Sequence, residues 1–368
     1  MKSLTSIEIA AVVKELKYLE GAIARKIYQP DNSELLFELF KTGKGKSMLR
    51  IVPGKTLYLT SFKRKNPLVP LSFVKFLRKR AANSFLEKIE QKGFERIVEF
   101  TFKTKTETYY MIAEFFSKGN VIFCNDDHKI ISALQVQLWK DRKIKANETY
   151  KFPPKANIDI FKIDENEFKK ILKESKKENI VKTLAVDIGL GGLYSEELCL
   201  RADIDKNKGK LLAKEIHKLF NELKKLAELE LKPFLFEKEA VPFDMIKYKG
   251  DKGQESPSFN GALDNYYKKF IKVEEKESIE DAHTKKIKKY EKIIEKQKLK
   301  LAELEKASKF NKDKGDLIYK NYIWVKDVLD TIKKARSKNV PWKEIEEKLK
   351  TKKIIVKGKM GQVILDLK

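Results

Sequence analysis

The sequence is poor in the residues that form disulfide frameworks and metal centres. Its 368 residues include two cysteines, Cys124 and Cys199, each inside an apolar run. Two cysteines are too few for a disulfide scaffold or a Cys-rich zinc module. The three histidines, His128, His217 and His283, show no metal-ligand spacing, and we expect surface or packing roles for them. The sequence therefore predicts no metal site and no cofactor.

Motifs of the common enzyme classes are missing as well. The sequence has no Walker loop, no dinucleotide-binding fingerprint after a strand and no nucleophile elbow. It also has no signal-peptide core, and no window approaches the roughly 20 apolar residues that a membrane span needs. We expect a non-enzymatic, soluble protein of the cytoplasm with no membrane partner.

Positive charge, in contrast, is abundant. The chain has 80 Lys and Arg against 54 Asp and Glu, a formal net charge of +26 at pH 7. Such an excess concerns binding partners rather than the fold, and it favours a polyanion, with nucleic acid ahead of an anionic membrane. Hydrophobic residues make up 42% of the chain, enough for the cores of two or three domains.

The first part of the chain, residues 1–172, predicts a mixed α and β domain with antiparallel sheet. A capping box formed by Thr5 and Glu8 precedes an apolar pattern of helical period. Short apolar runs separated by turn residues predict strands on both sides of a basic helix at 71–82. The predicted strands are 35–40, 48–52, 56–60, 85–91, 96–103, 108–116, 120–124 and 130–134.

The rest of the chain predicts mainly helices. Residues 173–268 are interpreted as an all-helical domain, residues 269–312 as a coiled-coil arm, and residues 313–368 as a small α/β tip. Because a single heptad seam must be covered by another helix, we expect either a second copy of the chain, forming a homodimer through the arm, or a longer protein of which this chain is a part. The seam consists of Ile287, Tyr290, Ile294, Gln297, Leu301 and Leu304.

Two turns are candidate binding sites. In the hairpin of Gly189, Gly191 and Gly192, the N–H groups that open the following helix can face a phosphate, as in helix-hairpin-helix modules, although a plain glycine-rich connection would have the same residues. Before the strand at 96–103, Arg96 suits a phosphate or a base edge and Glu95 can accept from a base amine. From the spacing alone, a solvated turn explains this pair better.

Two basic stretches suit a phosphate backbone, although either could be no more than a solvated surface. The residues are Arg78, Lys79 and Arg80 in the predicted helix, and Lys285, Lys286, Lys288, Lys289 and Lys292 in the arm.

Several segments together resemble the NFACT family, the RqcH/NEMF/FbpA-like proteins of ribosome-associated quality control. The resemblance covers nearly the whole chain in the expected order and implies an NFACT-N domain, a helix-hairpin-helix domain, a coiled-coil arm and the start of the middle domain, without the family's NFACT-R domain. The segments that carry the resemblance are 6–16, 26–30, 76–79, 93–98, 119–122, 190–197 and 259–267.

The resemblance implies a factor that recognises a large ribosomal subunit obstructed by peptidyl-tRNA. Its partners would be ribosomal RNA, the complex of nascent chain and tRNA, and an incoming tRNA, commonly alanyl-tRNA, for an untemplated C-terminal tail. Peptide transfer would stay with the ribosome. The family's tRNA-related residues are an Asp in the first helix and an Asp-Arg pair after Gly-Phe, and the matching positions here are Glu8, Glu95 and Arg96.

The same pairing of domains also looks like the formamidopyrimidine-type DNA glycosylases, so a glycosylase/AP-lyase-like repair protein is the alternative. Those enzymes use a proline at the second position and a four-cysteine zinc finger, whereas this chain has Lys2 and two cysteines. Lys2 would then have to serve as the Schiff-base amine. A surface adhesin is a third possibility, because some family members carry fibronectin-binding names.

Overall fold

The structure, a computed structural model, describes residues 2–139, 142–153, 158–228, 230–350 and 354–367, without the side chains of residues 272–286 and 359. The chain divides into two compact units, Met1–Glu275 and Lys276–Lys368. The bounds of the four predicted domains stay predictions. No helix within the described residues has an apolar stretch long enough to cross a membrane.

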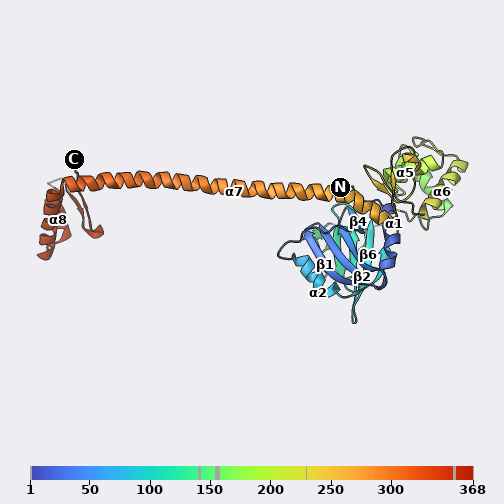
Figure 1. Ribbon diagram of the computed structural model, residues 1–368, viewed down its shortest axis with the longest axis horizontal. Coiled ribbons are helices and arrows are strands. Elements are labelled where there is room, and N and C mark those ends of the chain that lie inside the picture. Colours follow the sequence, from blue (N-terminus) through green and yellow to red (C-terminus); the bar gives the residue numbers. More distant parts are fainter. Residues whose placement is uncertain (1, 140–141, 154–157, 229, 351–353, 368) are drawn as a thin grey trace. The chain divides into compact units, whose positions relative to one another are not determined.

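The first unit is built on a nine-stranded antiparallel sheet (Figure 1) with the strand order β4-β3-β2-β1-β5-β6-β7-β8-β9. Its two halves join where Ala22 and Ile23 of β1 pair with Leu86 and Phe85 of β5. The strands are β1 (Ala22–Asp31), β2 (Glu34–Lys41), β3 (Gly45–Val52), β4 (Thr56–Leu59), β5 (Phe85–Gln91), β6 (Ile97–Lys103), β7 (Thr108–Glu114), β8 (Asn120–Cys124) and β9 (Ile130–Ala133).

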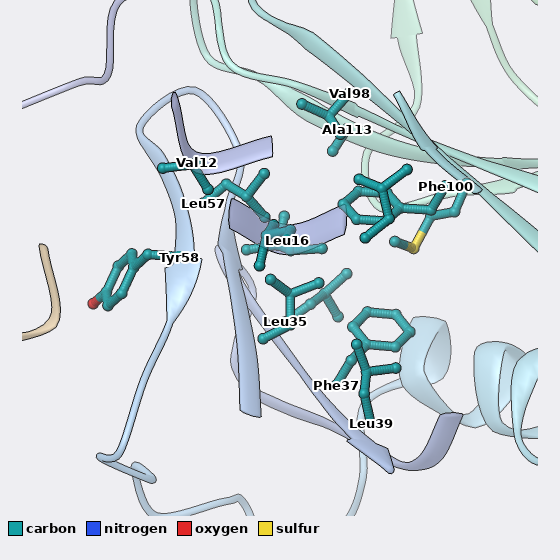
Figure 2. Close-up of a cluster of buried hydrophobic side chains, with 14 of the residues drawn as sticks. Val12, Leu16, Leu35, Phe37, Leu39, Leu57, Tyr58, Val98, Phe100 and Ala113 are labelled. Atoms are coloured by element: carbon teal, nitrogen blue, oxygen red, sulfur yellow. The ribbon is translucent and has the colours of Figure 1, made fainter. Parts of the chain in front are cut away.

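Three helices contribute to the core of this sheet, α1 (Ser6–Leu16), α2 (Ser72–Ala81) and the start of α7 (Phe259–Lys320). The predicted capping box opens α1: the Thr5 hydroxyl accepts from the Glu8 N–H at 3.3 Å, and the Glu8 carboxylate accepts from the Thr5 N–H at 2.7 Å. Leu16 then lies in one apolar cluster with Leu35 of β2 and Phe100 of β6 (Figure 2). The mixed α and β class with antiparallel sheet is therefore confirmed.

Most predicted strands agree with the structure, and β5 and β8 have the predicted bounds. The strand β1 is missing from the prediction. A register shift between Ala24 and Lys26 leaves two successive exposed residues in β1, and Pro30 lies near its end. The bulge breaks the two-residue alternation by which a half-buried strand is recognised.

Helices follow in the second part of this unit and share a core of their own. Phe168, Leu198 and Leu219 are among its fully buried side chains. The expectation that residues 173–268 are entirely helical is wrong at its end, because a small sheet of order β13-β12-β14 forms there. Its strands have two residues each, too few for a readable period. The elements are α3 (Glu165–Glu174), α4 (Ile180–Val186), α5 (Gly191–Arg201), α6 (Ala213–Ala227), β12 (Phe234–Leu235), β13 (Ala240–Val241), η2 (Ile246–Tyr248) and β14 (Gln254–Glu255).

The helix α7 (Phe259–Lys320) begins in the first unit and continues into the second. It runs past the predicted end at residue 312, because Gly315 does not interrupt it. Its apolar seam is exposed, by 50% at Ile294 and 57% at Leu301, and within the described residues no second helix covers it. The coiled coil and the homodimer therefore stay predictions. The tip contains α8 (Tyr322–Ser337), α9 (Trp342–Lys350), β15 (Ile355–Lys357), η3 (Gly358–Met360) and β16 (Gln362–Ile364).

Candidate nucleic-acid interface

The turn between β5 and β6 holds Glu95 and Arg96 in a fixed place. Gly93 supplies the left-handed backbone that the turn needs, with φ of +59°. The Phe94 side chain is buried in the core of the helical part. The Gln91 amide donates to the carbonyl of Glu95 and to that of Ser6 in α1, both at 2.9 Å. The turn is thus anchored on both sides and is not the plain solvated loop that its sequence permits.

Arg96 is a half-buried cation. Loss of solvent lowers the pKa of its guanidinium, and the neighbouring carboxylate of Glu95 opposes this shift. Among the described residues, the Arg96 guanidinium donates no hydrogen bond to an acceptor. Its backbone carbonyl accepts from the N–H of Phe115 at 2.8 Å, which fixes the residue beside β7. A desolvated guanidinium with unused donors gains most from an added acceptor such as a phosphate or a base edge.

Two cavities lie beside this turn and share Pro153 in their walls. The smaller one has a volume of about 330 Å³ and contains both apolar and charged groups. Its walls include Lys92, Gly93, Phe94, Glu95, Ile97, Phe152, Asp159 and Lys162. The larger one, of about 630 Å³, extends from the end of β7 to the hairpin of β10 (Gln137–Leu138) and β11 (Lys143–Ile144). Its walls include Glu114, Phe116, Lys118, Val136, Leu138, Trp139 and Arg142.

A buried carboxylate forms the inner wall of the larger cavity. Glu114 pairs with Arg142 and accepts from the Tyr150 hydroxyl at 2.8 Å. Burial, together with the Glu114 charge, raises the pKa of Tyr150, so the phenol stays protonated and donates. The Arg142 guanidinium lies 4.9 Å from the centre of the Tyr150 ring and 5.9 Å from that of Trp139. These contacts hold Arg142 at the rim, with Trp139 still 47% exposed.

Sequence reasoning did not find this larger cavity. A usable signal was the alternation of Val136 and Leu138 with Gln135 and Gln137 in a segment too polar to be a core strand. Alternation places these apolar side chains on one face. The side chains of Val136 and Leu138 are 69% and 66% exposed, so the face is open.

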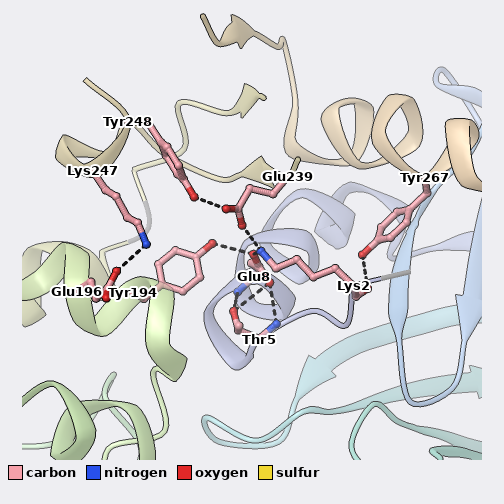
Figure 3. Close-up of polar contacts among 9 residues, drawn as sticks. All are labelled: Lys2, Thr5, Glu8, Tyr194, Glu196, Glu239, Lys247, Tyr248 and Tyr267. Atoms are coloured by element: carbon pink, nitrogen blue, oxygen red, sulfur yellow. Dashed lines mark hydrogen bonds and ion pairs between the residues drawn. The ribbon is translucent and has the colours of Figure 1, made fainter. Parts of the chain in front are cut away.

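Glu8 lies away from these cavities, in a network that joins three parts of the first unit (Figure 3). Its carboxylate is buried and accepts from the Tyr194 hydroxyl at 3.0 Å and from the Lys2 ammonium at 3.3 Å. Lys2 also pairs with Glu239, which accepts from the Tyr248 hydroxyl. The structure therefore encloses Glu8 between α1, α5 and the β12–β13 turn, and a role in direct tRNA contact stays a prediction.

The network also fixes the charge of Lys2. Burial alone would lower the pKa of this amine, but the charges and hydrogen bonds of Glu8 and Glu239 raise it above its usual value. The same partners outweigh burial at Glu239 and lower the pKa of that carboxyl. Lys2 is accordingly an ammonium ion with two carboxylate partners.

The glycine hairpin lies directly beside this network. Gly189 and Gly191 have φ of +82° and +76°, a conformation that favours glycine. The helix α5 begins at Gly191, and its N-cap residue Leu190 makes no side-chain capping bond. No atom within 4 Å would meet a Cβ placed at Gly192. Space is thus open beside Gly192, and phosphate binding by the first N–H groups of α5 stays a prediction.

The basic residues predicted for phosphate contact differ in their surroundings. Arg78 donates from Nε to the Ile27 carbonyl at 2.7 Å, so it also holds α2 on β1. Lys79 is exposed, and Arg80 lies over the Phe76 ring at 5.3 Å. In the second unit Lys288, Lys289 and Lys292 are exposed on α7. The side chains of Lys285 and Lys286 lie outside the described residues.

The histidines have ordinary surroundings where their side chains are described. The His128 ring contacts Glu99 at 3.1 Å and stacks on Tyr110, and His217 pairs with Glu165 at 2.9 Å. The His283 side chain lies outside the described residues. No group of His, Cys, Asp and Glu in the described part of the chain is arranged to hold a metal ion.

Comparisons with known proteins agree with this architecture. The family described as NFACT N-terminal and middle domains matches residues 5–357. The archaeal Rqc2 homologue aRqcH of Methanocaldococcus jannaschii is 36% identical over 398 aligned positions, which cover 100% of this chain and 59% of the relative. The Rqc2 homologue RqcH of Bacillus subtilis is 29% identical over 222 positions, 56% of this chain and 38% of the relative. This chain therefore spans less than two thirds of the length of the curated relatives that it matches.

A solved structure shares the fold of much of the chain. The N-terminal part of the fibronectin/fibrinogen-binding protein from Streptococcus suis superimposes with a TM-score of 0.61 at 23% identity. The match covers 73% of this chain and 100% of the solved one. Together with the family match over residues 5–357, these similarities show that the chain belongs to the NFACT family.

Proposed function

We propose that this protein is a ribosome-associated quality control factor that binds large ribosomal subunits obstructed by peptidyl-tRNA. In this proposal it also recruits tRNA, so that the stalled nascent chain receives an untemplated C-terminal tail. Alanyl-tRNA is the preferred candidate. The observation that carries the proposal is the half-buried Arg96 guanidinium, which has no described hydrogen-bond acceptor and belongs to a turn whose residues Glu95 and Ile97 line the smaller cavity. Support comes from relatives that bear ribosome quality control names, such as the NEMF homologue of Drosophila melanogaster, 38% identical over 31% of this chain and 12% of the relative.

The turn and the two cavities suit unpaired nucleotides better than a duplex. Arg96 offers a planar fork of donors, and Glu95 beside it can accept from a base amine. Phe152, which is 42% exposed, and Trp139 present aromatic faces at the smaller and the larger cavity. Proteins commonly recognise single-stranded RNA by stacking bases on such rings. An exposed loop of a tRNA would supply both the bases and the phosphates.

The arm and tip suit a longer RNA surface. Residues 276–368 contain 27 Lys and Arg against 15 Asp and Glu, a net +12 in a quarter of the chain. Exposed lysines on a helix release counterions when they approach phosphates, so ribosomal RNA is the natural counterpart. Lys288, Lys289 and Lys292 are the described members of the predicted ribosome-facing set.

The chain itself would perform no bond chemistry in this proposal, and peptide transfer would be left to the ribosome. The glycosylase alternative requires a nucleophilic amine at Lys2. The raised pKa of Lys2 and its two carboxylate partners keep the amine protonated and therefore without a free electron pair. Borohydride trapping on abasic DNA is expected to give no adduct, whereas an adduct lost in Lys2→Ala would overturn the proposal.

The direct test is cosedimentation of the chain with large subunits that carry peptidyl-tRNA, followed by sequencing of the bound tRNA. Enrichment on obstructed over empty subunits, with one tRNA class over-represented, is the expected result. Equal binding to both kinds of subunit, with no tRNA class enriched in the bound fraction, would contradict it. Arg96→Ala separates the two functions, because it should reduce the recovered tRNA more than the recovered subunits.

A further inference from the structure

The segment that connects β4 to β5 carries positive charge only. Residues 60–84 contain seven Lys and Arg and no Asp or Glu. Lys63, Lys65, Lys75, Arg78 and Lys79 are exposed among them. An uninterrupted set of cations on one loop and one short helix favours a polyanionic partner.

The start of this segment is fixed to the body of the first unit. The Asp264 carboxylate accepts from the Ser61 N–H at 3.0 Å and from the Ser61 hydroxyl at 2.7 Å. Arg64 donates to Asp31 at 2.8 Å and to Glu34 at 2.9 Å. The far end is fixed as well, since the Gln29 side chain accepts from the Val74 N–H at 3.1 Å. A loop held at both ends can present its apex in a defined position.

The apex consists of two apolar side chains between two prolines. Leu68 has a relative exposure of 103% and Val69 of 70%, so neither packs on the protein. Pro67 and Pro70 restrict the backbone on either side and lack an N–H group. The apex is therefore stiff and apolar, and Lys63 and Lys65 precede it in the chain, so it is suited to enter an apolar space within a polyanion.

We propose that Leu68 and Val69 form a wedge that enters RNA at an unstacked or bulged base while Lys65 and other exposed cations of this segment bind the adjoining phosphates. Apolar wedges of this kind insert at base steps of nucleic acids held by basic residues. A base in a loop or bulge gives up little stacking, which makes RNA with irregular structure the preferred substrate. The inference rests on the proposed RNA-binding function and adds a contact that is separate from Arg96 and the two cavities.

An apolar wedge and a phosphate contact affect the salt dependence of binding differently. Affinity for total deacylated tRNA, and separately for large ribosomal subunits, is measured for the full chain over a range of salt concentrations. Leu68→Ala is expected to weaken binding to tRNA, to large subunits or to both about tenfold. The slope of log affinity against log salt concentration should stay unchanged, because no charge is removed. Lys65→Gln should weaken binding and reduce the slope by about one. Leu68→Phe should retain the affinity, because a larger ring still fills the gap.

The matched control is Leu212→Ala. Leu212 is also an exposed leucine, with a relative exposure of 69%, and it lies at the start of α6. It should leave both affinities unchanged. A photo-crosslinking residue placed at position 68 is expected to join RNA in the subunit complex, whereas crosslinking to protein alone would overturn the wedge. Unchanged affinity of Leu68→Ala for both RNAs would also overturn it, with the proposed function intact if the wild-type chain binds. Failure of the wild-type chain to bind either RNA would count against both proposals.

Discussion

Glu15 in α1 caps α7 through Asn260, 245 positions further along the chain. Its carboxylate accepts from the backbone N–H of Asn260 at 2.8 Å and from the Asn260 side-chain amide at 2.6 Å. It also accepts from the N–H of Phe259 at 2.6 Å. A carboxylate at this position satisfies N–H groups that have no partner within the helix and interacts favourably with the helix dipole. The base of the arm is thus attached to the first helix of the sheet domain.

The first prediction concerns this cap. Glu15→Ala leaves the first N–H groups of α7 without their acceptor, and we expect the free energy of unfolding of the first unit to fall by about 2 kcal/mol. Urea titration followed by far-ultraviolet circular dichroism measures the change. Glu87→Ala, at an exposed pair with Lys103, is the control and should cost less than about 0.5 kcal/mol. A cost for Glu15→Ala as small as that of the control would show that α7 is held by its apolar contacts alone.

The second prediction is a pH dependence at Glu239. Because the folded-state pKa of this carboxyl lies below its usual 4.5, its contribution to stability is present above that pH and is lost as pH falls through the folded-state value. Glu239→Gln should therefore destabilise the chain at pH 7, and the difference from wild type should shrink below about pH 4.5.

The readout is the difference in urea midpoint between wild type and Glu239→Gln, followed from pH 7 to pH 4. Lys2 does not change charge in this range, because its pKa is raised above 10.5. The shrinking difference therefore reports the carboxyl. A difference that stays constant down to pH 4, or grows, would exclude the ion pair as its source.

The third prediction concerns two glycines that approach each other. A Cβ built at Gly119, whose φ is +66°, would lie 1.9 Å from the backbone nitrogen of Gly54 and 2.3 Å from the carbonyl carbon of Pro53. Gly119→Ala should therefore cost roughly 3 kcal/mol or more, since backbone must move. Gly45→Ala is the matched control, because φ there is +79° but nothing lies within 4 Å. It should cost about 1 kcal/mol, from the left-handed backbone alone.

Thermal unfolding of the two alanine variants separates a steric cost from a conformational one. Equal losses would mean that the loop at Gly54 moves away without strain. Because Gly119 also lines the larger cavity, a reduced affinity for tRNA in Gly119→Ala is interpretable only after the stability of that variant is known.

What the sequence could reveal depended on the distance along the chain over which each contact acts. The capping box of Thr5 and Glu8 acts over three residues and was predicted and confirmed. The strands β5 and β8 have the predicted bounds, because turn residues flank them on both sides. The bond from Glu15 to Asn260 joins positions with no common local pattern, so no periodicity indicates it.

The candidate site shows the same limit. Its residue types could be read from the sequence, since Gly, Phe, Glu and Arg are consecutive in the chain. Its burial could not, because the desolvation of Arg96 depends on how the turn, α1 and β7 come together. The pair of Glu114 and Arg142 was missed for the same reason, as the partners are 28 positions apart and meet only in the wall of the larger cavity.

The last prediction tests Arg96 itself. If its guanidinium makes a bidentate contact with RNA, Arg96→Ala should weaken tRNA binding by roughly 1 to 3 kcal/mol. Arg96→Lys should recover only part of this, because an ammonium keeps the charge but loses the planar fork. Unfolding free energy should change little, since the guanidinium has no described hydrogen-bond acceptor to lose.

Arg25→Ala, which removes an exposed arginine over the Phe40 ring of β2, is the control for net charge and should leave affinity nearly unchanged. Equal effects of the two variants would reduce Arg96 to a contributor of bulk charge. A selective loss at Arg96, with the half-buried environment intact, would identify the turn as the point where the protein recognises its tRNA.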